Sequence, residues 1–151
     1  MHKWTKRRTA AIAGALAAAG LAITGLSATP AAAEGGKIQG WRIDSSPFRC
    51  DWGAVCFYYS PGAEGAIWRK YADTDYNLGD NKFWSDNYGS AGSGMQVHDN
   101  SASMDNGTGG TLWAWKNINM TGSVAWTPSG YGGNLGNVGL RNEISSYNVT
   151  Y

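Results

Sequence analysis

The chain has 151 residues and a formal net charge of +1, and charged side chains make up only 15% of it. It contains 22 glycines and eight tryptophans, a composition that disfavours long helices and coiled coils. Abundant glycine and aromatic residues instead favour short strands joined by tight turns. We therefore predict an all-β sandwich or barrel.

The first 33 residues have the three parts of a secretory signal peptide. Four Lys or Arg residues fall within the first eight positions, an apolar run covers residues 10–28, and residues 31–33 are a small-residue cleavage site. The run is rich in Ala and Gly and ends at that site, which favours a cleaved signal over a membrane anchor. We expect cleavage near Ala33 and a secreted, extracellular protein.

Removal of the signal changes the charge of the chain. The remaining 118 residues carry eight Lys or Arg against eleven Asp or Glu, a net charge of −3, and are enough for one domain. Because no basic patch remains, we do not expect the mature chain to bind nucleic acid. We also expect no membrane association, and a monomer, since nothing in the sequence suggests a coiled coil.

The first predicted feature of the mature chain is a disulfide between Cys50 and Cys56. The export route leads to an oxidising compartment, where two cysteines separated by five residues pair readily. A reactive free thiol is the poorer interpretation, because His98 is the only histidine left to act as its base.

A repeat follows the cysteines. Residues 55–70 align with residues 112–127 at a constant offset of 57, and the tripeptide Asn-Leu-Gly recurs at the same offset further on. Gly65 and Gly122 occupy the same place in the two copies, as expected where a hairpin folds back on itself. Matching Asn100 to Asn142 lowers the offset to 42, so the first copy carries fifteen extra residues, which we place within residues 83–97.

Each copy has an aromatic residue, four further residues, a Met or Ala, one more residue and a Gly, and each later reaches a polar turn ending in Ser. This pattern resembles the βγ-crystallin Greek key. The secreted framework is more specifically similar to an actinobacterial family of metalloproteinase inhibitors built on that fold. The matching pieces are "CDWGAVCFYY" (50–59), "GSAGSGMQVHDNSAS" (89–103) and "LRNEISSYNV" (140–149).

The resemblance implies a sandwich of two Greek-key motifs over residues 48–151. Residues 34–47 lie outside it, and we expect this N-terminal arm to be disordered or loosely paired. The resemblance also implies a function: a rigid extracellular domain that occludes the active-site cleft of a metallopeptidase with a taut loop. One departure is that better-defined inhibitors of this family carry a second disulfide, so their reactive segment does not transfer residue by residue.

Two loops are candidates for the contact with a peptidase. The first is "SPGAEGA" (60–66), and the second is "SDNYGSAGSG" (85–94). The first has the stronger claim, because the predicted disulfide lies beside it and restrains its motion, whereas the second also fits an ordinary flexible insertion. The candidate contact residues are Ser60, Pro61, Gly62, Ala63, Glu64, Asn87 and Tyr88.

The two polar turns resemble the calcium-binding turns of βγ-crystallins. Their candidate oxygen donors are Asp99, Asn100, Ser101 and Ser103 in the first turn and Asn142, Glu143 and Ser145 in the second. The first turn has Met104 where the pattern ends in Ser, and the second opens with Arg141, whose guanidinium accepts no hydrogen bond. Three alternatives stay open: purely structural turns, one site around Asp99, Asn100 and Ser103, or two full sites. No cofactor is required.

A second functional hypothesis is a non-catalytic module that binds calcium, carbohydrate or the cell wall, or that acts as an antifungal toxin. Exposed aromatic rings stack on sugars, and the aromatic residues on apparent loops are Trp41, Trp52, Trp84 and Tyr88. We predict that the chain is not an enzyme. With one histidine after signal removal, a His-x-x-x-His zinc site cannot form, and the carboxylates of Asp73, Asp75, Asp80 and Asp86 are scattered.

Overall fold

A computed structural model describes residues 34–44, 49–71 and 73–151, so the predicted signal peptide lies outside the described residues. The described chain forms two five-stranded sheets. Sheet A has the order β1 (Gly36–Lys37), β8 (Thr121–Thr127), β7 (Thr111–Asn117), β10 (Ser146–Thr150) and β5 (Thr74–Asp75). Sheet B has the order β2 (Trp41–Arg42), β9 (Tyr131–Asn134), β6 (Ser103–Asn106), β3 (Val55–Ser60) and β4 (Glu64–Lys70).

Short 3-10 turns complete the secondary structure. They are η1 (Pro61–Ala63), η2 (Leu78–Asp80), η3 (Ile118–Met120) and η4 (Leu135–Val138). Within the described ranges no helix is long and apolar enough to cross a membrane.

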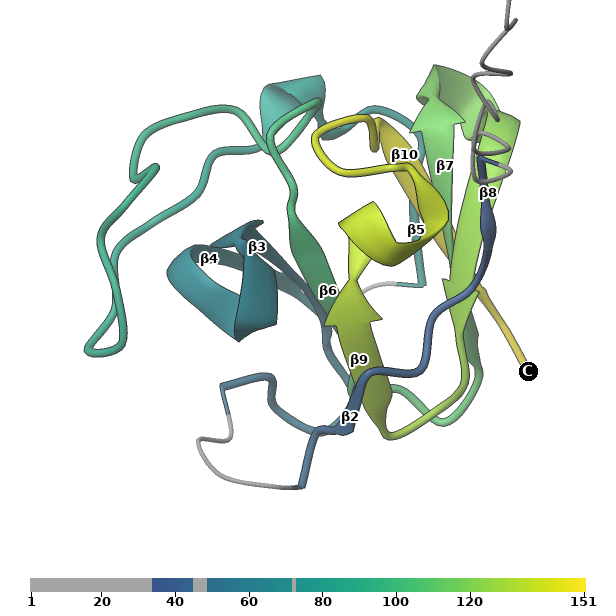
Figure 1. Ribbon diagram of the computed structural model, residues 1–151, viewed down its shortest axis with the longest axis horizontal. Helices are drawn as coiled ribbons and strands as arrows, with labels where there is room; N and C mark the ends of the chain where they lie inside the picture. The colour runs from purple at the N-terminus through teal and green to yellow at the C-terminus, as the bar shows by residue number, and fades with distance from the viewer. Residues whose placement is uncertain (1–33, 45–48, 72) are drawn as a thin grey trace, which may run out of the picture. The chain divides into compact units, whose positions relative to one another are not determined.

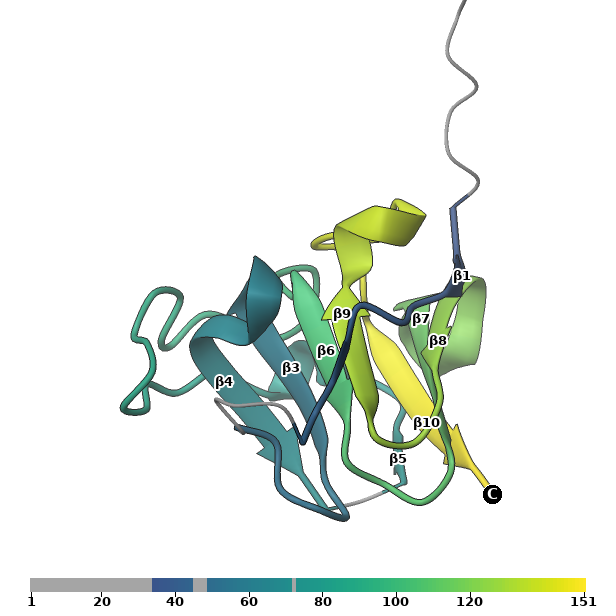
Figure 2. The same ribbon diagram turned by 60° about the horizontal axis from the view of Figure 1, so that its bottom comes forward.

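The chain is folded as two Greek-key halves that exchange one strand each (Figures 1 and 2). The first half is β3 to β6, and its third strand, β5, joins sheet A while the other three lie in sheet B. The second half is β7 to β10, and its third strand, β9, joins sheet B. This arrangement confirms the prediction of an all-β sandwich of two Greek-key motifs.

The main core lies between the two sheets. Its centre is an aromatic cluster in which the ring of Phe57 lies 5.8 Å from the rings of Trp68 and Tyr147, centroid to centroid. Tilted and edge-on contacts of this kind add to the hydrophobic gain, which is about 2–3 kcal/mol for one large apolar side chain. Because β3 and β4 come from the first half and β10 from the second, this cluster joins the halves.

A smaller cluster covers the other face of sheet B. It contains the disulfide of Cys50 and Cys56, with an S–S distance of 2.09 Å, packed with Ala54, Tyr58 and Ile67. The predicted disulfide is therefore confirmed. Strand β3 has core on one face and this cluster on the other, which explains why four of its successive residues are buried.

The N-terminal arm differs from the expectation of a disordered or loosely paired segment. β1 adds to sheet A in parallel with β8, and β2 adds to sheet B antiparallel to β9. Ile38 and Ile43 are only 1% and 3% exposed. Burial of these two apolar side chains stabilises the packing of residues 34–44 against both sheets. Residues 45–48 lie outside the described ranges, so the domain boundary at residue 48 stays a prediction.

The repeat is visible in the backbone. The two hairpin tips have left-handed conformations at matching positions: φ is 76° at Gly62 and 57° at Asn119, and 72° at Gly65 and 81° at Gly122. The sequence offset of 57 therefore aligns residues with the same local structure. Asn tolerates the left-handed region better than most residues, which explains how it replaces Gly in the second tip.

Candidate functional site

The first candidate loop, residues 60–66, is a rigid hairpin tip. The hydroxyl of Ser103 donates to the Ser60 carbonyl (2.7 Å) and accepts from the Ala63 amide (3.1 Å). The Gly62 amide donates to the side-chain oxygen of Asn134 at 2.7 Å. Pro61, Gly62 and Glu64 are nevertheless exposed. The tip thus presents accessible residues on a backbone that side chains from β6 and β9 hold in place.

The second candidate loop lies within the insertion that lengthens the first half. The insertion begins by pairing with β4, where the amides and carbonyls of Ile67 and Trp84 exchange hydrogen bonds of 3.0 and 2.9 Å. It returns where the Phe83 amide donates to the Met95 carbonyl at 2.9 Å. Between these points, residues 85–94 project from the sandwich (Figure 1). Tyr88, near their tip, is 56% exposed.

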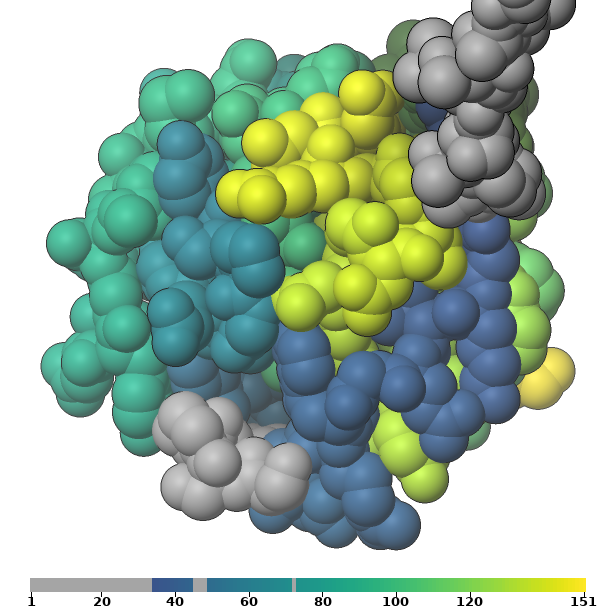
Figure 3. Space-filling view, viewed as in Figure 1, coloured from purple at the N-terminus to yellow at the C-terminus, as the bar shows by residue number. Residues whose placement is uncertain are grey.

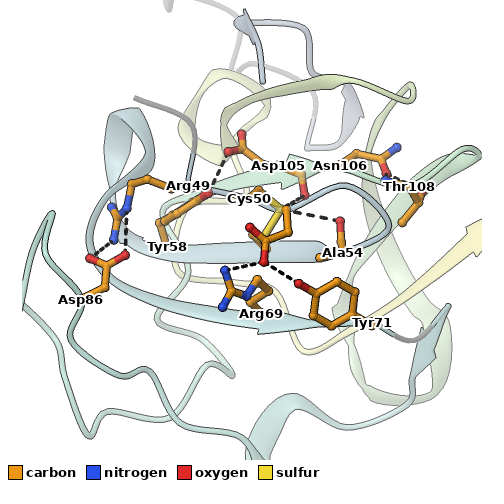
Figure 4. The surroundings of a disulfide bond; sticks show 12 residues. Arg49, Cys50, Ala54, Tyr58, Arg69, Tyr71, Asp86, Asp105, Asn106 and Thr108 are labelled. Atoms are coloured by element: carbon orange, nitrogen blue, oxygen red, sulfur yellow. Dashed lines mark hydrogen bonds and ion pairs between the residues drawn. A yellow bond between two sulfur atoms is a disulfide. The ribbon is translucent and has the colours of Figure 1, made fainter. Parts of the chain in front are cut away.

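Arg49 joins the two loops. Its guanidinium donates to the carbonyls of Ala63 and Gly65 in the first loop, the latter at 2.9 Å. It also makes a two-bond ion pair with Asp86 in the second loop, at 2.7 and 3.2 Å (Figure 4). Its side chain is only 1% exposed. One buried cation therefore satisfies acceptors in both loops, a geometry that suits the planar fork of Arg and not the point charge of Lys.

The backbones of the loops also touch. The Ala66 amide donates to the Ala91 carbonyl at 2.8 Å. A Cβ atom added to Gly89 would lie 2.8 Å from the Cα of Gly65, and one added to Gly92 would overlap the ring of Tyr59. Only glycine permits this approach. Residues 60–66 and 85–94, here called the loop pair, therefore form one continuous surface, visible at the teal and green edge of Figure 3.

Two aromatic rings lie close to the Arg49 guanidinium. Its central carbon is 5.0 Å from the ring centre of Tyr58 and 5.4 Å from that of Tyr88. Cation–π contacts of this kind are stronger where water is excluded. Cys50, the next residue, is bonded to Cys56 of β3. The disulfide thus restrains the loop pair indirectly, by fixing the segment that carries Arg49.

A buried carboxylate, that of Asp105, holds the Tyr58 side chain that lies beside Arg49. Asp105 accepts from the Tyr58 hydroxyl at 2.8 Å (Figure 4). It also accepts from the indole nitrogen of Trp41 at 2.7 Å. Burial raises the pKa of Asp105, although both hydrogen bonds and the Arg49 charge oppose that shift. Burial, with the Asp105 charge and hydrogen bond, also raises the pKa of Tyr58. Trp41, predicted as a loop aromatic, is therefore part of a structural network.

The structure corrects the alignment of the two polar turns by one residue. Ser103 and Ser146 have the same role, because the Ser146 hydroxyl donates to the Asn117 carbonyl (2.6 Å) and accepts from the Met120 amide (3.0 Å). Asp99 and Asn142 also match, with φ values of 54° and 59°. The offset between the turns is therefore 43 and not 42, and the first half carries fourteen extra residues.

The corrected alignment changes which residues of the two turns correspond to each other. Ser145 now corresponds to Ala102, which is buried and has no side-chain oxygen. The basic residues His98 and Arg141 both stand at the first position of their turns. The Ser103 hydroxyl bonds the backbone of the first hairpin tip. The single site around Asp99, Asn100 and Ser103 stays a prediction, in which the Ser103 hydroxyl already has two partners at the first hairpin tip.

Other members of the predicted calcium set have local partners. The Ser101 hydroxyl is buried and donates to the Val97 carbonyl at 3.0 Å. The Asn100 amide side chain donates to the His98 carbonyl at 2.9 Å. The backbone N–H of Asn142, in the second turn, donates to the Ser101 carbonyl of the first turn at 2.8 Å. These contacts are those of turn-forming residues.

Asp99, Glu143 and Ser145 do share a shallow pocket beside the second hairpin tip. The ammonium of Lys116 also lies there, 3.2 Å from the Glu143 carboxylate and 3.1 Å from that of Glu34. The Ser145 hydroxyl donates to the Lys116 carbonyl at 2.6 Å. Hydrogen bonds to Glu34 and Glu143 raise the pKa of Lys116, so the ammonium keeps its charge. The positive charge of Lys116 therefore disfavours the binding of a metal ion in the same pocket.

Across residues 34–44, 49–71 and 73–151, no three His, Cys, Asp or Glu side chains converge as metal ligands. Calcium binding by the predicted donors of the two turns stays a prediction, which the Lys116 ammonium opposes in the pocket around Asp99 and Glu143.

Two groups of residues were not found from the sequence. Arg49 gives no sequence signal beyond its position before Cys50, because its partners lie 14 to 37 residues away. The second group is Trp113, Trp115 and Trp126, which lie partly exposed in sheet A. The alternation in "LWAW" (112–115) was a signal, since alternate residues of a strand point to opposite faces.

Comparison with known proteins supports the fold. No protein-family model and no curated protein matches the sequence. A solved structure from work on the evolution of the eye lens βγ-crystallin domain fold matches with a TM-score of 0.53 and 17% identity, covering 66% of this chain and 87% of that one. A βγ-crystallin domain from Clostridium beijerinckii matches with a TM-score of 0.45 and 20% identity, covering 64% and 95%. The chain therefore has a βγ-crystallin-like fold.

Proposed function

We propose that the mature chain is a secreted, non-catalytic inhibitor of an extracellular metallopeptidase, and that the loop pair occludes the active-site cleft. The observation that carries this proposal is the contact of one buried guanidinium, that of Arg49, with both candidate loops. The two predicted contact loops, residues 60–66 and 85–94, thereby form one preorganised surface.

The inhibitory mechanism follows from the rigidity of this surface. A flexible loop loses about 0.5–1.5 kcal/mol for each side chain that becomes ordered on binding, whereas a preorganised loop has already lost that freedom. The exposed turn at Asn87 and Tyr88 enters the cleft, and the Tyr88 ring fills an apolar subsite. The first loop, around Pro61 and Glu64, rests on the rim. Arg49 keeps both segments in place if a peptide bond is cut.

The proposal is tested by titrating oxidised residues 34–151 against a thermolysin-type metallopeptidase, with a serine peptidase as the control. We expect stoichiometric loss of metallopeptidase activity at nanomolar to micromolar concentration and no effect on the serine peptidase. Full metallopeptidase activity at a large molar excess would contradict the proposal.

A matched pair of variants locates the contact. Tyr88→Ala removes an exposed ring from the loop pair, and we expect the inhibition constant to rise at least tenfold, which corresponds to about 1.4 kcal/mol. Tyr71→Ala removes a ring that is 64% exposed and lies outside the loop pair, and it should leave inhibition unchanged. Equal effects of the two substitutions would place the contact elsewhere.

A calcium-binding module is the second candidate. The observation in its favour is that Asp99 and Glu143, with the Ser145 hydroxyl, line one pocket. The Lys116 ammonium in the same pocket counts against a strong site. Removal of that ammonium therefore decides between the two interpretations of the turns, as developed in the Discussion.

A further inference from the structure

The outer face of sheet A presents tryptophans where a solvated sheet normally presents polar residues. On β7, Leu112 and Ala114 are fully buried in the core, so Trp113 and Trp115 point to the opposite face. Trp126 of β8 pairs directly with Trp113 and shares that face. All three are partly exposed. Contiguous exposed aromatic surface of this kind marks interaction sites.

The rings on this face are held in fixed positions. The ring centres of Trp113 and Trp126 lie 5.6 Å apart, with their planes inclined by 32°. The indole nitrogen of Trp113 donates to the Thr150 hydroxyl at 2.9 Å, and that of Trp115 donates to the side-chain oxygen of Asn148 at 3.1 Å. The indole N–H groups are thus satisfied within the sheet, and the ring faces are what remains for a ligand.

The polar groups beside the rings are hydrogen-bond donors. Asn148 and Thr150 use oxygen atoms to accept from the indoles, which leaves the amide NH₂ and the hydroxyl O–H of these side chains as donors. The ammonium of Lys37 lies 5.5 Å from the ring centre of Trp126. Of the residues that strand pairing places on this face, Lys37 is the only charged one.

The charge of the face differs from that of the molecule. Residues 34–151 carry a net charge of −3, whereas the described residues that strand pairing places on this face include one cation and no carboxylate. The face therefore complements a ligand with apolar ring surfaces and many acceptor oxygens. Pyranose rings with acetamido groups have both, because their C–H faces stack on indoles and their carbonyls accept from amides, hydroxyls and ammonium groups.

We propose that the outer face of sheet A binds a polysaccharide of N-acetylated sugars, with Trp113, Trp115 and Trp126 as the stacking platform. Asn148, Thr150 and Lys37 supply donors to the acetamido carbonyls. This site lies on the sheet opposite to the one that carries most of the loop pair, and none of the aromatic residues predicted from the sequence belongs to it. It would hold the inhibitor on a glycan surface while the loop pair stays free.

The test is co-sedimentation of oxidised residues 34–151 with insoluble chitin and, separately, with cellulose, which lacks acetamido groups. We expect retention on chitin and much weaker retention on cellulose. Tryptophan fluorescence should change when soluble N-acetylglucosamine oligomers are added. No retention on chitin, or equal retention on the two polymers, would overturn the proposal.

Three variants and one control assign the binding to this face. Trp113→Ala should weaken binding at least tenfold. Asn148→Asp keeps the acceptor for Trp115 but removes the donor, and Lys37→Glu reverses the exposed charge, so both should weaken binding several-fold without removing any ring. Trp52→Ala, which removes a ring that is 62% exposed and not in sheet A, should leave binding unchanged. Loss of binding in Trp52→Ala alone would contradict the assignment.

Self-association is the competing occupant of this face. Light scattering should show a monomer for the wild type and for Trp113→Ala. A dimer that Trp113→Ala dissociates, without chitin binding, would mean that a second copy covers the face and that the proposal is wrong. The Trp113→Ala variant should inhibit a metallopeptidase as the wild type does, so failure of either function is separable from failure of the other.

Discussion

The two hairpin tips, residues 60–66 and 117–123, have the same backbone but different surroundings. A serine hydroxyl closes each tip in the same way, from Ser103 in the first half and Ser146 in the second. Beside the first tip the cation is Arg49, with a side chain that is 1% exposed. Beside the second tip it is Lys116, which is 31% exposed.

This difference distinguishes the features that both halves share, here called the repeated frame, from those that only one half has. The serines belong to the repeated frame and are expected to contribute equally in both halves. The buried guanidinium belongs to the first half alone, where it joins the tip to an insertion that the second half lacks. An exposed ion pair adds little stability, whereas a buried pair is costly to break because one charge is left without its partner.

The largest expected effect is that of removing the buried cation. We expect Arg49→Met to lower the free energy of unfolding by about 3 kcal/mol, because Asp86 and two carbonyls lose their donor. Arg69→Met is the control, since Arg69 is 33% exposed and its ion pair with Asp51 should be worth less than about 1 kcal/mol. Urea unfolding measures both. Equal losses would remove the distinction between buried and exposed cations.

The next effect tests the shared frame. Ser103→Ala and Ser146→Ala each remove two hydrogen bonds from a partly buried hairpin tip, at a cost of about 1 kcal/mol for each bond. We expect the two losses to agree within about 0.5 kcal/mol, since the geometry is the same. Thermal or urea unfolding of the two variants is the measurement. A much larger loss in one half would show that the tips are not equivalent.

The third effect is a pH dependence of the free energy of unfolding, caused by Asp105 in sheet B. Because burial raises the pKa of Asp105, the folded state favours its protonated form. The stability that protonation gives is present below the usual pKa of 3.8 and is lost as the pH rises through the raised value. The stability of Asp105→Asn relative to the wild type should therefore increase as the pH rises from about 3 to 7. Urea unfolding across this range would contradict the account if the slope were opposite.

The smallest effect concerns the second tip. We expect no change in the melting temperature of the wild type on adding millimolar calcium, because the Lys116 ammonium lies beside Glu143 and Glu34. Lys116→Met leaves the carboxylates without that cation, and calcium should then raise the melting temperature by a few degrees. Lys70→Met, which removes an exposed lysine paired with Asp75, is the control. A calcium response in the wild type would contradict this reading of the pocket.

Much of the fold followed from the sequence because its signals are local. The repeat at an offset of 57 aligned Gly65 with Gly122, and both have positive φ values, which only a few residue types adopt readily. The cysteine spacing, together with the predicted signal peptide, predicted the disulfide. The N-terminal arm gave no such signal, since β1 and β2 are two residues each and pair with strands about 90 residues away.

The details of the candidate site depend on contacts that a sequence does not display. Matching Asn100 with Asn142 in the sequence aligned the polar turns at an offset of 42. The hydrogen bonds of Ser103 and Ser146 show that the offset is 43. The contact of Arg49 with Asp86 spans 37 residues. Tryptophans in "LWAW" indicated that one face of β7 is aromatic, but only the burial of Leu112 and Ala114 decides which face is outside.

The central claim is that Arg49 makes residues 60–66 and 85–94 one rigid surface. Amide hydrogen exchange of Arg49→Lys tests it most directly, because one ammonium nitrogen replaces the three guanidinium nitrogens that together reach Asp86 and two carbonyls. The account predicts that exchange accelerates in both segments together, while residues 117–123 are unchanged and Arg69→Lys resembles the wild type. Faster exchange in only one of the two segments, or in neither, would contradict the claim.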